Sequence, residues 1–304
     1  MKRLLFKIIL NISINFSIKY NSLYIYNMDS VTLIVLAAGK SSRFGGSPKL
    51  LSQIGKNNET LYEVLIRQIK GVIPYHQIHF VFSDHTRKPI MDVVTSKKLE
   101  YLTQDCDITF SLQIYSIKRE KPWGTADALA SCEPYVKNRF LLLNSDDIFD
   151  NATFNTIINE CEKSKNYIIG FPLGNTLEND KPANRGFVVL EDNKSNLINQ
   201  IVEKLNIKRS FYSEEELEKI IVSVNLLLLE HTILPLITNK VEEFKRTCLN
   251  PKEEEILLPD ILNQLIQDKK IELYFKKSQG NWNGITYIED VNKVRKTLIE
   301  NKVF

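Results

Sequence analysis

The chain has 304 residues, of which 43% are hydrophobic and 25% charged, an ordinary composition for a soluble globular protein. This length allows one large α/β domain or two smaller ones. The formal net charge of +3 is too small to indicate nucleic acid or a membrane surface as a partner, and we expect neither. The four cysteines show no CxxC or Cys/His spacing, so we expect no metal site built from cysteines.

Residues 1–27 differ from the rest of the chain, because they contain no acidic residue and are rich in Ile, Asn, Lys and Tyr. Lys2 and Arg3 precede an apolar run, as in a signal peptide, but Lys7 interrupts that run and no cleavage pattern follows. The segment is also too short and too polar to span a bilayer. We therefore predict that residues 1–28 are a weakly ordered extension of a cytoplasmic protein. An upstream extension or a misassigned start fits at least as well as targeting.

From residue 29 onward, short apolar runs alternate with amphipathic stretches. The apolar runs predict strands at residues 31–35, 78–82, 109–114, 140–143, 167–171, 187–190 and 222–229. Helical patterns occur at residues 61–69, 90–102, 125–132, 253–267 and 289–300, with Thr60 as a cap of the first. This alternation predicts a doubly wound, mostly parallel α/β sheet. No Pro/Gly/Ser linker or internal repeat divides the chain, so we expect a single domain over residues 29–304.

A glycine-rich turn with two cations, LAAGKSSRFGGSPK at residues 36–49, directly follows the first apolar run. In an open α/β sheet, ligands bind where a strand ends and the chain turns back into a helix. A turn of small residues lets backbone N–H groups approach a phosphate, and Arg43 and Lys49 add positive charge. The spacing is neither that of a P-loop nor GxGxxG. The segment therefore predicts a nucleotide-phosphate loop of another kind.

This segment resembles the opening motif of the nucleotidyltransferases, LAAGxxxRxxxxPK, with Arg43, Pro48 and Lys49 at the matching positions. The resemblance implies a Rossmann-like fold and transfer of a nucleotidyl group from an NTP to a sugar 1-phosphate, with release of pyrophosphate. It implies that Arg43 contacts the leaving pyrophosphate and Lys49 the α-phosphate. The nucleotide-binding residues that it implies in this loop are Leu36, Ala37, Ala38 and Gly39.

A second segment, KPWGTADAL at residues 121–129, resembles the PxGTAxAL segment that contacts the nucleobase in sugar nucleotidyltransferases. Gly124 and Thr125 begin a predicted helix, where backbone groups are available to a ligand. No residue before Gly124 identifies the base; we expect UTP, with dTTP as a further possibility. The resemblance divides the domain into a nucleotide half at about residues 29–150 and a sugar-phosphate half at about 151–304.

An acidic pair, Asp146 and Asp147, follows the apolar strand at residues 140–143. A carboxylate at the end of a parallel strand lies at the carboxyl edge of the sheet, facing the same crevice as the first loop. Nucleotidyl transfer needs Mg²⁺ to neutralise charge on the phosphates. In register with the family, Asp146 is the metal ligand. The segment at residues 282–290 resembles the W-x-D-x-G-T-P-E-D ending of the family, but Gly284 stands where the second metal-binding Asp is expected. Asn283 or Asp290 could substitute, and we take Asp290 as the candidate, although an acidic residue there is equally typical of the first turn of a helix.

Several segments of the second half resemble the sugar-phosphate site of the family. Gly186 in Arg-Gly-Phe would approach the sugar, Glu203 would bind its hydroxyls, and Lys204 would hold its phosphate. Asn225, which enters a run of four leucines, matches a sugar-contacting Asn, and residues 254–260 match a late acidic element. An ordinary exposed ion pair explains Glu203 and Lys204 about as well, and a solvated helix face explains the acidic element.

Two other functions stay open from the sequence. The loop also resembles that of cytidylyltransferases acting on non-sugar alcohol phosphates, such as choline phosphate or methylerythritol phosphate. A non-catalytic, nucleotide-sensing regulatory subunit of the same fold is the other alternative, although Arg43, Lys49 and Asp146 are all present. The expected partners are an NTP and a small phosphate acceptor, and a homo-oligomer is possible.

Overall fold

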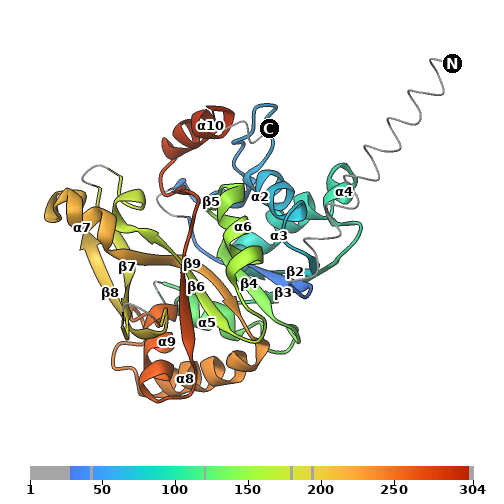
Figure 1. Ribbon diagram of the computed structural model, residues 1–304. Coiled ribbons are helices and arrows are strands. Elements are labelled where there is room, and N and C mark those ends of the chain that lie inside the picture. The colour runs from blue at the N-terminus through green and yellow to red at the C-terminus, as the bar shows by residue number, and fades with distance from the viewer. Residues whose placement is uncertain (1–27, 42–43, 120, 179–180, 193–194, 301–304) are drawn as a thin grey trace.

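A computed structural model of the chain describes residues 28–41, 44–119, 121–178, 181–192 and 195–300 (Figure 1). The predicted extension at residues 1–27 and the predicted catalytic residue Arg43 lie outside the described residues. Met28, the first described residue, is buried in the core.

The fold is an α/β structure built on one large sheet (Figure 1). Its strands are β1 (Val31–Ala37), β2 (Tyr75–Phe82), β3 (Asp107–Leu112), β4 (Phe140–Asn144), β6 (Asn166–Pro172), β7 (Ala183–Leu190), β8 (Ile198–Ile207), β9 (Ile221–Leu229) and β10 (Leu273–Lys277). A separate two-stranded sheet pairs β5 (Asp147–Phe149) with β11 (Trp282–Gly284). The helices are α2 (Leu61–Lys70), α3 (Asp84–Val94), α4 (Glu100–Thr103), α5 (Thr125–Ala130), α6 (Asn151–Glu160), α7 (Glu214–Lys219), α8 (Leu234–Thr247), α9 (Leu258–Gln267) and α10 (Asp290–Glu300).

The strand order of the main path is β10-β6-β9-β4-β1-β2-β3, and β7 joins β9 to β8. Strands β3, β2, β1 and β4 are mutually parallel, as predicted, whereas β9 runs antiparallel to both β4 and β6. The carboxyl ends of β1 and β4 are adjacent, since Leu36 pairs with Asn144 and the Ser145 N–H donates to the Leu36 carbonyl at 3.0 Å. This register brings the two predicted motifs at residues 36–49 and 146–147 to one edge of the sheet.

Helices cover both faces of the sheet, which confirms the doubly wound class. Alternate side chains of β1 enter opposite clusters, with Leu33 on one side and Ile34 on the other. Helices α2, α3 and α6 pack on the first face and α5, α8 and α9 on the second (Figure 1). Full burial on both faces explains why the strand reads as an unbroken apolar run.

Two predicted helices differ from the structure at their boundaries. The pattern at residues 90–102 is divided into α3, which begins earlier, after Ser83, and the short α4. The pattern at residues 253–267 becomes helical only at Leu258, where Pro259 occupies the first turn and cannot extend the helix backward. The predicted Thr60 cap is present as a full capping box with Glu63.

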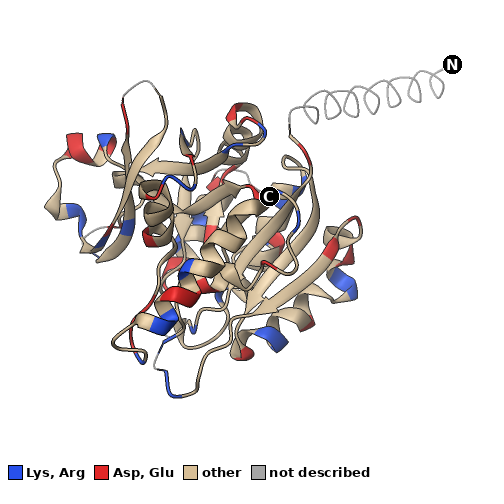
Figure 2. Ribbon diagram, turned by 90° about the horizontal axis from the view of Figure 1, so that it is seen from below, with Lys and Arg blue, Asp and Glu red and all other residues tan. Residues whose placement is uncertain are grey.

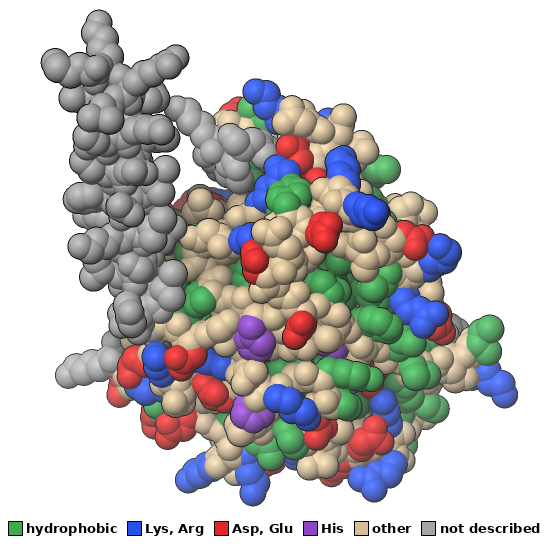
Figure 3. Space-filling view, turned by 90° about the vertical axis from the view of Figure 1, so that its right-hand side faces the viewer, with side chains coloured by type: hydrophobic (Ala, Val, Ile, Leu, Met, Phe, Trp, Pro, Cys, Tyr) green, Lys and Arg blue, Asp and Glu red, His purple; other side chains and the backbone are tan. Residues whose placement is uncertain are grey.

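The surface carries charges of both signs, interspersed along the helices (Figure 2). The side of the molecule that lies to the right in Figure 1 likewise shows hydrophobic side chains scattered among charged ones (Figure 3). Neither view has a large area of one charge, in keeping with the small net charge. Among the described residues, no helix has the length and apolarity needed to cross a bilayer.

Candidate functional site

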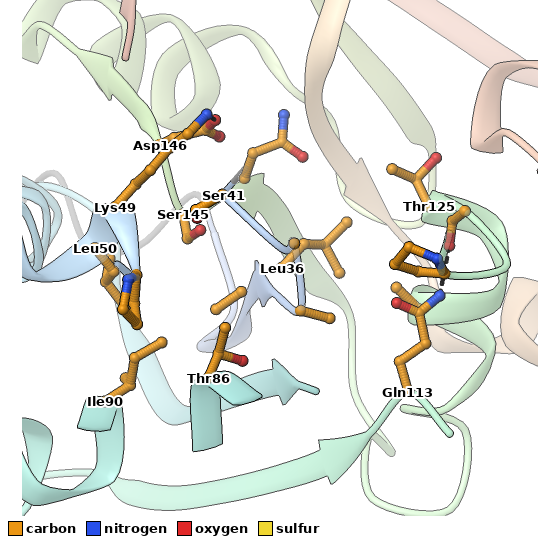
Figure 4. A pocket seen from close by; sticks show the side chains of 18 of the residues that line it. Leu36, Ser41, Lys49, Leu50, Thr86, Ile90, Gln113, Thr125, Ser145 and Asp146 are labelled. Atoms are coloured by element: carbon orange, nitrogen blue, oxygen red, sulfur yellow. Dashed lines mark hydrogen bonds and ion pairs between the residues drawn. The ribbon is translucent and has the colours of Figure 1, made fainter. Parts of the chain in front are cut away.

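A cavity of about 250 Å³ lies at the carboxyl edge of β1 and β4 (Figure 4). Lys49 and Asp146 stand at one end of it, and Gln113 and Thr125 at the other. The predicted nucleotide-binding residues of both loops line it, namely Leu36, Ala37, Ala38, Gly39, Gly124 and Thr125. The structure thus brings together two segments more than 80 residues apart in the chain, as the sequence motifs led us to expect.

Lys49 and Asp146 form an ion pair at the cavity wall, with 2.7 Å between Lys49 Nζ and Asp146 Oδ2. Lys49 lies in a 3-10 turn directly after Pro48, and Asp146 follows the end of β4. Their side chains keep 16% and 32% of their surface exposed, so both charged groups are accessible to a ligand in the cavity. The Lys49 ammonium group could bind a phosphate, and the Asp146 carboxylate could bind a metal cation. The ion pair would then separate, and each charge would face its own ligand.

Asp147, the neighbour of Asp146, has a structural position instead. It is buried and accepts hydrogen bonds from Asn144 Nδ2 and Trp282 Nε1, both at 2.8 Å. Burial, with a smaller contribution from the Asp146 charge, raises the pKa of Asp147 to about 8. Asn144 also donates to the Val224 carbonyl at 3.1 Å. Asp147 therefore ties the β5–β11 pair to the end of β4 and orients its neighbour.

The structure does not bring Asp290 to Asp146, which corrects the predicted pair of metal ligands. Asp290 lines a different cavity, where its Oδ2 accepts the N–H groups of Thr286 and Tyr287 at 2.9 and 2.7 Å. Its Oδ1 lies 3.3 Å from Lys181 Nζ. Asp290 thus caps the first turn of α10, a role that acidic residues often take at a helix N-terminus. No group of three or more His, Cys, Asp or Glu side chains suited to a metal occurs in the described ranges.

Gly284, the position where the family motif expects an acidic residue, is paired with Asp147 across β5 and β11. A Cβ atom at Gly284 would lie 2.5 Å from the Trp282 ring, so the indole occupies the space that a longer side chain would need. The indole N–H is directed to Asp147. Gly284 therefore supplies no carboxylate at this position, and the indole of Trp282 fills the space beside it.

Gly124 shapes the opposite wall of the cavity. Its φ of 103° and ψ of −178° lie in a region that only glycine adopts readily. A Cβ atom there would lie 2.4 Å from the carbonyl oxygen of Ile256. Further hydrogen bonds join the two segments, from Ile256 N–H to the Trp123 carbonyl at 2.7 Å and from Leu258 N–H to Thr125 Oγ1 at 2.9 Å. The late acidic element at residues 254–260 thus supports the segment at residues 121–129.

We expect Gly124→Ala to lower the free energy of unfolding by at least about 2 kcal/mol, because it adds backbone strain and a steric clash with Ile256. Urea denaturation measures this loss. Gly71→Ala is a matched control, since Gly71 has a φ of −85° and open space around it. Equal stability of the two variants would contradict the constraint at Gly124.

Gln113 was not predicted as a site residue, although it lines the cavity. Its Nε2 donates to the Gly124 carbonyl at 2.8 Å and to Asp127 Oδ2 at 2.9 Å. Both partners are acceptors, which fixes the amide orientation, and Figure 4 shows the amide oxygen toward the cavity. The predicted strand at residues 109–114 included Gln113, whereas β3 ends at Leu112. A polar residue just beyond the carboxyl end of a strand is the signal that could have identified it.

The predicted sugar residues lie in two groups. Gly186 and Glu203 pair across β7 and β8, and a Cβ atom at Gly186 would lie 3.4 Å from Glu203 Oε2. Lys204 points to the opposite face, as consecutive strand residues do, and its Nζ lies 4.4 Å from the ring centroid of Phe187. Glu203 and Lys204 therefore lie on opposite faces of β8.

Asn225 occupies an irregular position in β9, between the paired stretches that contact β6. Its φ of 64° is in the left-handed region, and its N–H donates to Ser223 Oγ at 3.1 Å. Asparagine tolerates this conformation better than other non-glycine residues. The irregularity lies next to Val224, whose carbonyl accepts from Asn144 beside the acidic pair. Asn225 is thus near the end of β4, as a substrate-contacting residue would need to be.

Glu203 is a titratable group whose pKa is displaced. Burial, followed by the nearby Asp260 charge, raises the pKa of Glu203 to about 7, against an opposing effect of Arg185. The folded protein therefore binds this proton more tightly than the unfolded chain does. Its contribution to stability is present below the unfolded pKa near 4.5 and is lost as the pH rises through 7.

We therefore expect Glu203→Gln to reduce the decline in stability between pH 5 and pH 8, because the amide does not ionise beside Asp260. Urea denaturation at both pH values measures the effect, with Glu215→Gln, an exposed glutamate on α7, as the control. The same pH dependence in the Glu203 variant as in the wild type would rule out the buried proton.

Comparison with known proteins agrees with this geometry. Residues 33–171 match the MobA-like NTP transferase domain. The bifunctional protein GlmU of Methanococcus maripaludis strain S2 is 26% identical over 263 residues, which cover 85% of this chain and 52% of GlmU. GlmU of Methanococcus vannielii is 26% identical over 276 residues, covering 88% of this chain and 55% of that protein. The chain thus spans about half the length of the curated relatives it matches.

Solved structures share the fold. A UDP-glucose pyrophosphorylase bound to UDP-glucose superimposes with a TM-score of 0.66 at 16% identity, covering 90% of this chain and 100% of that one. The inositol-1-phosphate CTP transferase of T. maritima superimposes with a TM-score of 0.63 at 16% identity, covering 90% and 98%. The family match, the relatives and the shared fold agree with the predicted resemblance: residues 33–171 of this chain match a MobA-like NTP transferase domain, and the chain as a whole resembles nucleotidyltransferases.

Proposed function

We propose that this protein transfers the uridylyl group of UTP to a sugar 1-phosphate and releases pyrophosphate, with dTTP as a second donor. The observation that carries the proposal is the cavity itself, which has an exposed Lys49–Asp146 pair at one end and Gln113 at the other. One end suits phosphates and a cation, and the other suits a base. The match of residues 33–171 to a MobA-like NTP transferase domain and the UDP-glucose pyrophosphorylase neighbour support the same reaction class.

The chemistry requires positioning and charge neutralisation. A phosphate oxygen of the acceptor attacks the α-phosphorus of UTP in line; the new P–O bond forms as the bond to the bridging oxygen breaks, and that electron pair leaves with pyrophosphate. The attacking oxygen is already anionic, so no general base is needed. Lys49 stabilises charge on the α-phosphate, and Arg43, from the family motif, would act on the leaving pyrophosphate. Gly186 and Glu203 would contact the sugar.

Mg²⁺ is the cofactor that the donor set fits. Mg²⁺ in proteins is commonly held by one or two carboxylates together with substrate phosphates. Asp146 supplies one accessible carboxylate on the cavity wall, close to the position of the phosphates beside Lys49. When bound, the ion would neutralise charge on the phosphate oxygens. Asp146 would hold the ion, and the buried Asp147 keeps the loop that carries Asp146 in place.

The orientation of the Gln113 amide favours uracil or thymine over cytosine. Its Nε2 is engaged by two acceptors, so the carbonyl Oε1 is the atom available to a base. An acceptor at this position bonds the N3–H of uracil or thymine, whereas N3 of cytosine is itself an acceptor. A base held with N3 beside Oε1 therefore binds more tightly when N3 carries a proton, whereas cytosine offers Oε1 its N4 amino group only if the base shifts in the site. This orientation supports UTP or dTTP over CTP as the proposed donor.

The test is pyrophosphate release by the purified protein with Mg²⁺ and a panel of nucleotides and acceptors. UTP, dTTP and CTP are each combined with sugar 1-phosphates, choline phosphate and methylerythritol phosphate. We expect release with UTP and a sugar 1-phosphate, and none without an acceptor. Release only with CTP and a non-sugar phosphate would replace the proposal with the cytidylyltransferase alternative. Nucleotide binding without release on any acceptor would favour a regulatory subunit.

A further inference from the structure

We propose that Asp127, held in place by Lys245, is a positioning residue that sets the base selectivity of the site by locking the amide of Gln113. The inference rests on the proposed function, because it concerns how the same cavity chooses among nucleotides. Asp127 occupies the variable position of the GTAxAL segment, so the motif itself assigns it no role. Lys245 lies on α8, a helix outside every motif discussed above.

Gln113, Asp127 and Lys245 form a chain of side-chain contacts, which we call the relay. Gln113 Nε2 donates to Asp127 Oδ2 at 2.9 Å, and Lys245 Nζ lies 2.6 Å from Asp127 Oδ1. The Asp127 side chain is only 7% exposed and that of Lys245 is 25% exposed. Each carboxylate oxygen thus has its own donor. The ion pair fixes Asp127, and Asp127 in turn fixes which end of the Gln113 amide faces it.

The negative charge of Asp127 determines whether the Gln113 amide presents a hydrogen-bond acceptor or a donor to the cavity. An ionised carboxylate only accepts hydrogen bonds, so it selects the NH₂ end of the amide and leaves Oε1 for the ligand. A glutamine amide without such a partner can turn about its last bond and present either end. Asp127 therefore holds Gln113 with its Oε1 toward the cavity, where this oxygen can accept a hydrogen bond from a base with an N3–H group.

The variant Asp127→Asn should change this polarity with little change in shape. The Lys245 ammonium only donates hydrogen bonds, so it retains the asparagine oxygen and turns the asparagine NH₂ toward Gln113. The Gln113 amide then faces a donor, so we expect it to turn its oxygen toward the asparagine NH₂ and its Nε2 toward the cavity. The Gly124 carbonyl opposes this rotation, because it also accepts from Nε2. We therefore expect a mixture of the two orientations.

The experiment compares the UTP-to-CTP ratio of equilibrium binding constants, and of kcat/KM where turnover is found. For Asp127→Asn we expect this ratio to fall by about 10-fold, the size of effect that one mispaired buried hydrogen bond has on discrimination. The double variant Asp127→Asn/Lys245→Gln removes the unmatched cation and should lower the ratio as well if the single variant folds poorly. Lys240→Met is the matched control, because Lys240 on the same helix pairs with Asp268 at 2.9 Å, away from Gln113.

The outcomes separate this inference from the proposed function. A ratio unchanged in both Asp127 variants, with only a lower melting temperature, would show that the relay merely joins α5 to α8 and would overturn the inference. A wild-type protein that binds CTP as tightly as UTP would contradict the proposed donor instead. A fall in the ratio equal to that of Lys240→Met would also overturn the role of Asp127, because it would reflect general loosening of α8.

Discussion

The variant Lys49→Ala is expected to lower kcat/KM by about 10²–10³-fold, the usual effect of removing one charge that stabilises a transition state. Lys49 Nζ is exposed to the cavity and is paired only with Asp146 among the described residues, so it can move to a phosphate without breaking other contacts. The stability should change by less than about 1 kcal/mol, because the pair is partly solvated. Initial rates of pyrophosphate release and a thermal melt measure the two effects.

Lys88→Ala provides the control for Lys49. Lys88 on α3 pairs with Asp92 at 2.7 Å, but its side chain is 81% exposed. The control should keep wild-type activity. Full activity of Lys49→Ala, or an equal loss in both variants, would remove Lys49 from the proposed mechanism.

The variant Asp146→Asn is expected to abolish the stimulation of turnover by Mg²⁺ and to reduce kcat by at least about 10²-fold, since an amide is a much weaker ligand for a hard cation. The fold should be retained, because the Asp146 side chain is partly exposed and makes one ion pair. Rates are measured across a Mg²⁺ titration, and the apparent metal affinity should fall with the rate.

Asp147→Asn distinguishes a metal ligand from a structural carboxylate. Asp147 accepts from Asn144 and Trp282, and an asparagine offers only one acceptor atom to these two donors. We therefore expect a lower melting temperature and a smaller loss of activity than for Asp146→Asn, with the Mg²⁺ dependence retained. If Asp147→Asn lost its Mg²⁺ response and Asp146→Asn kept it, the two assignments would have to be exchanged.

Local sequence patterns were sufficient to predict the parallel half of the sheet and the edge at which the site lies. Strands β1 and β4 are buried on both faces and read as apolar runs, and the rule that ligands bind at carboxyl ends places residues 36–49 and Asp146 together. The resemblance of the loop to the nucleotidyltransferase motif then implied separate tasks for Arg43 and Lys49. These features depend on short stretches of chain, which is why they are visible without a structure.

The features that were missed depend on contacts between distant segments. Gln113 acquires its orientation from Gly124 and Asp127, which are 11 and 14 residues further along the chain. Helix α8, which supplies Lys245, was not predicted, although its apolar residues recur at helical spacing. An acidic residue at the start of a helix, such as Asp290, looks alike in sequence whether it caps the helix or binds a metal. Only its hydrogen bonds to Thr286 and Tyr287 distinguish the two.

The way in which the second half of the described chain joins the first also depends on pairing between distant strands. Strand β9 returns antiparallel between β4 and β6, so the second half of the chain is built onto the first half's sheet. Gly186 on β7 and Glu203 on β8 thereby belong to the same sheet as β4, whose carboxyl end is followed by Asp146. Sequence periodicity cannot reveal this pairing, because β9 reads as an ordinary buried strand.

Label transfer tests the central claim most directly. The purified protein is incubated with Mg²⁺, UTP labelled at the α-phosphate and a sugar 1-phosphate, and the products are separated. The proposed function predicts that the label appears in a uridine diphosphate sugar, with one pyrophosphate released for each molecule formed, and that Lys49→Ala forms almost none. Label that remains in UTP with every sugar 1-phosphate, while CTP is consumed with a non-sugar acceptor, would contradict it.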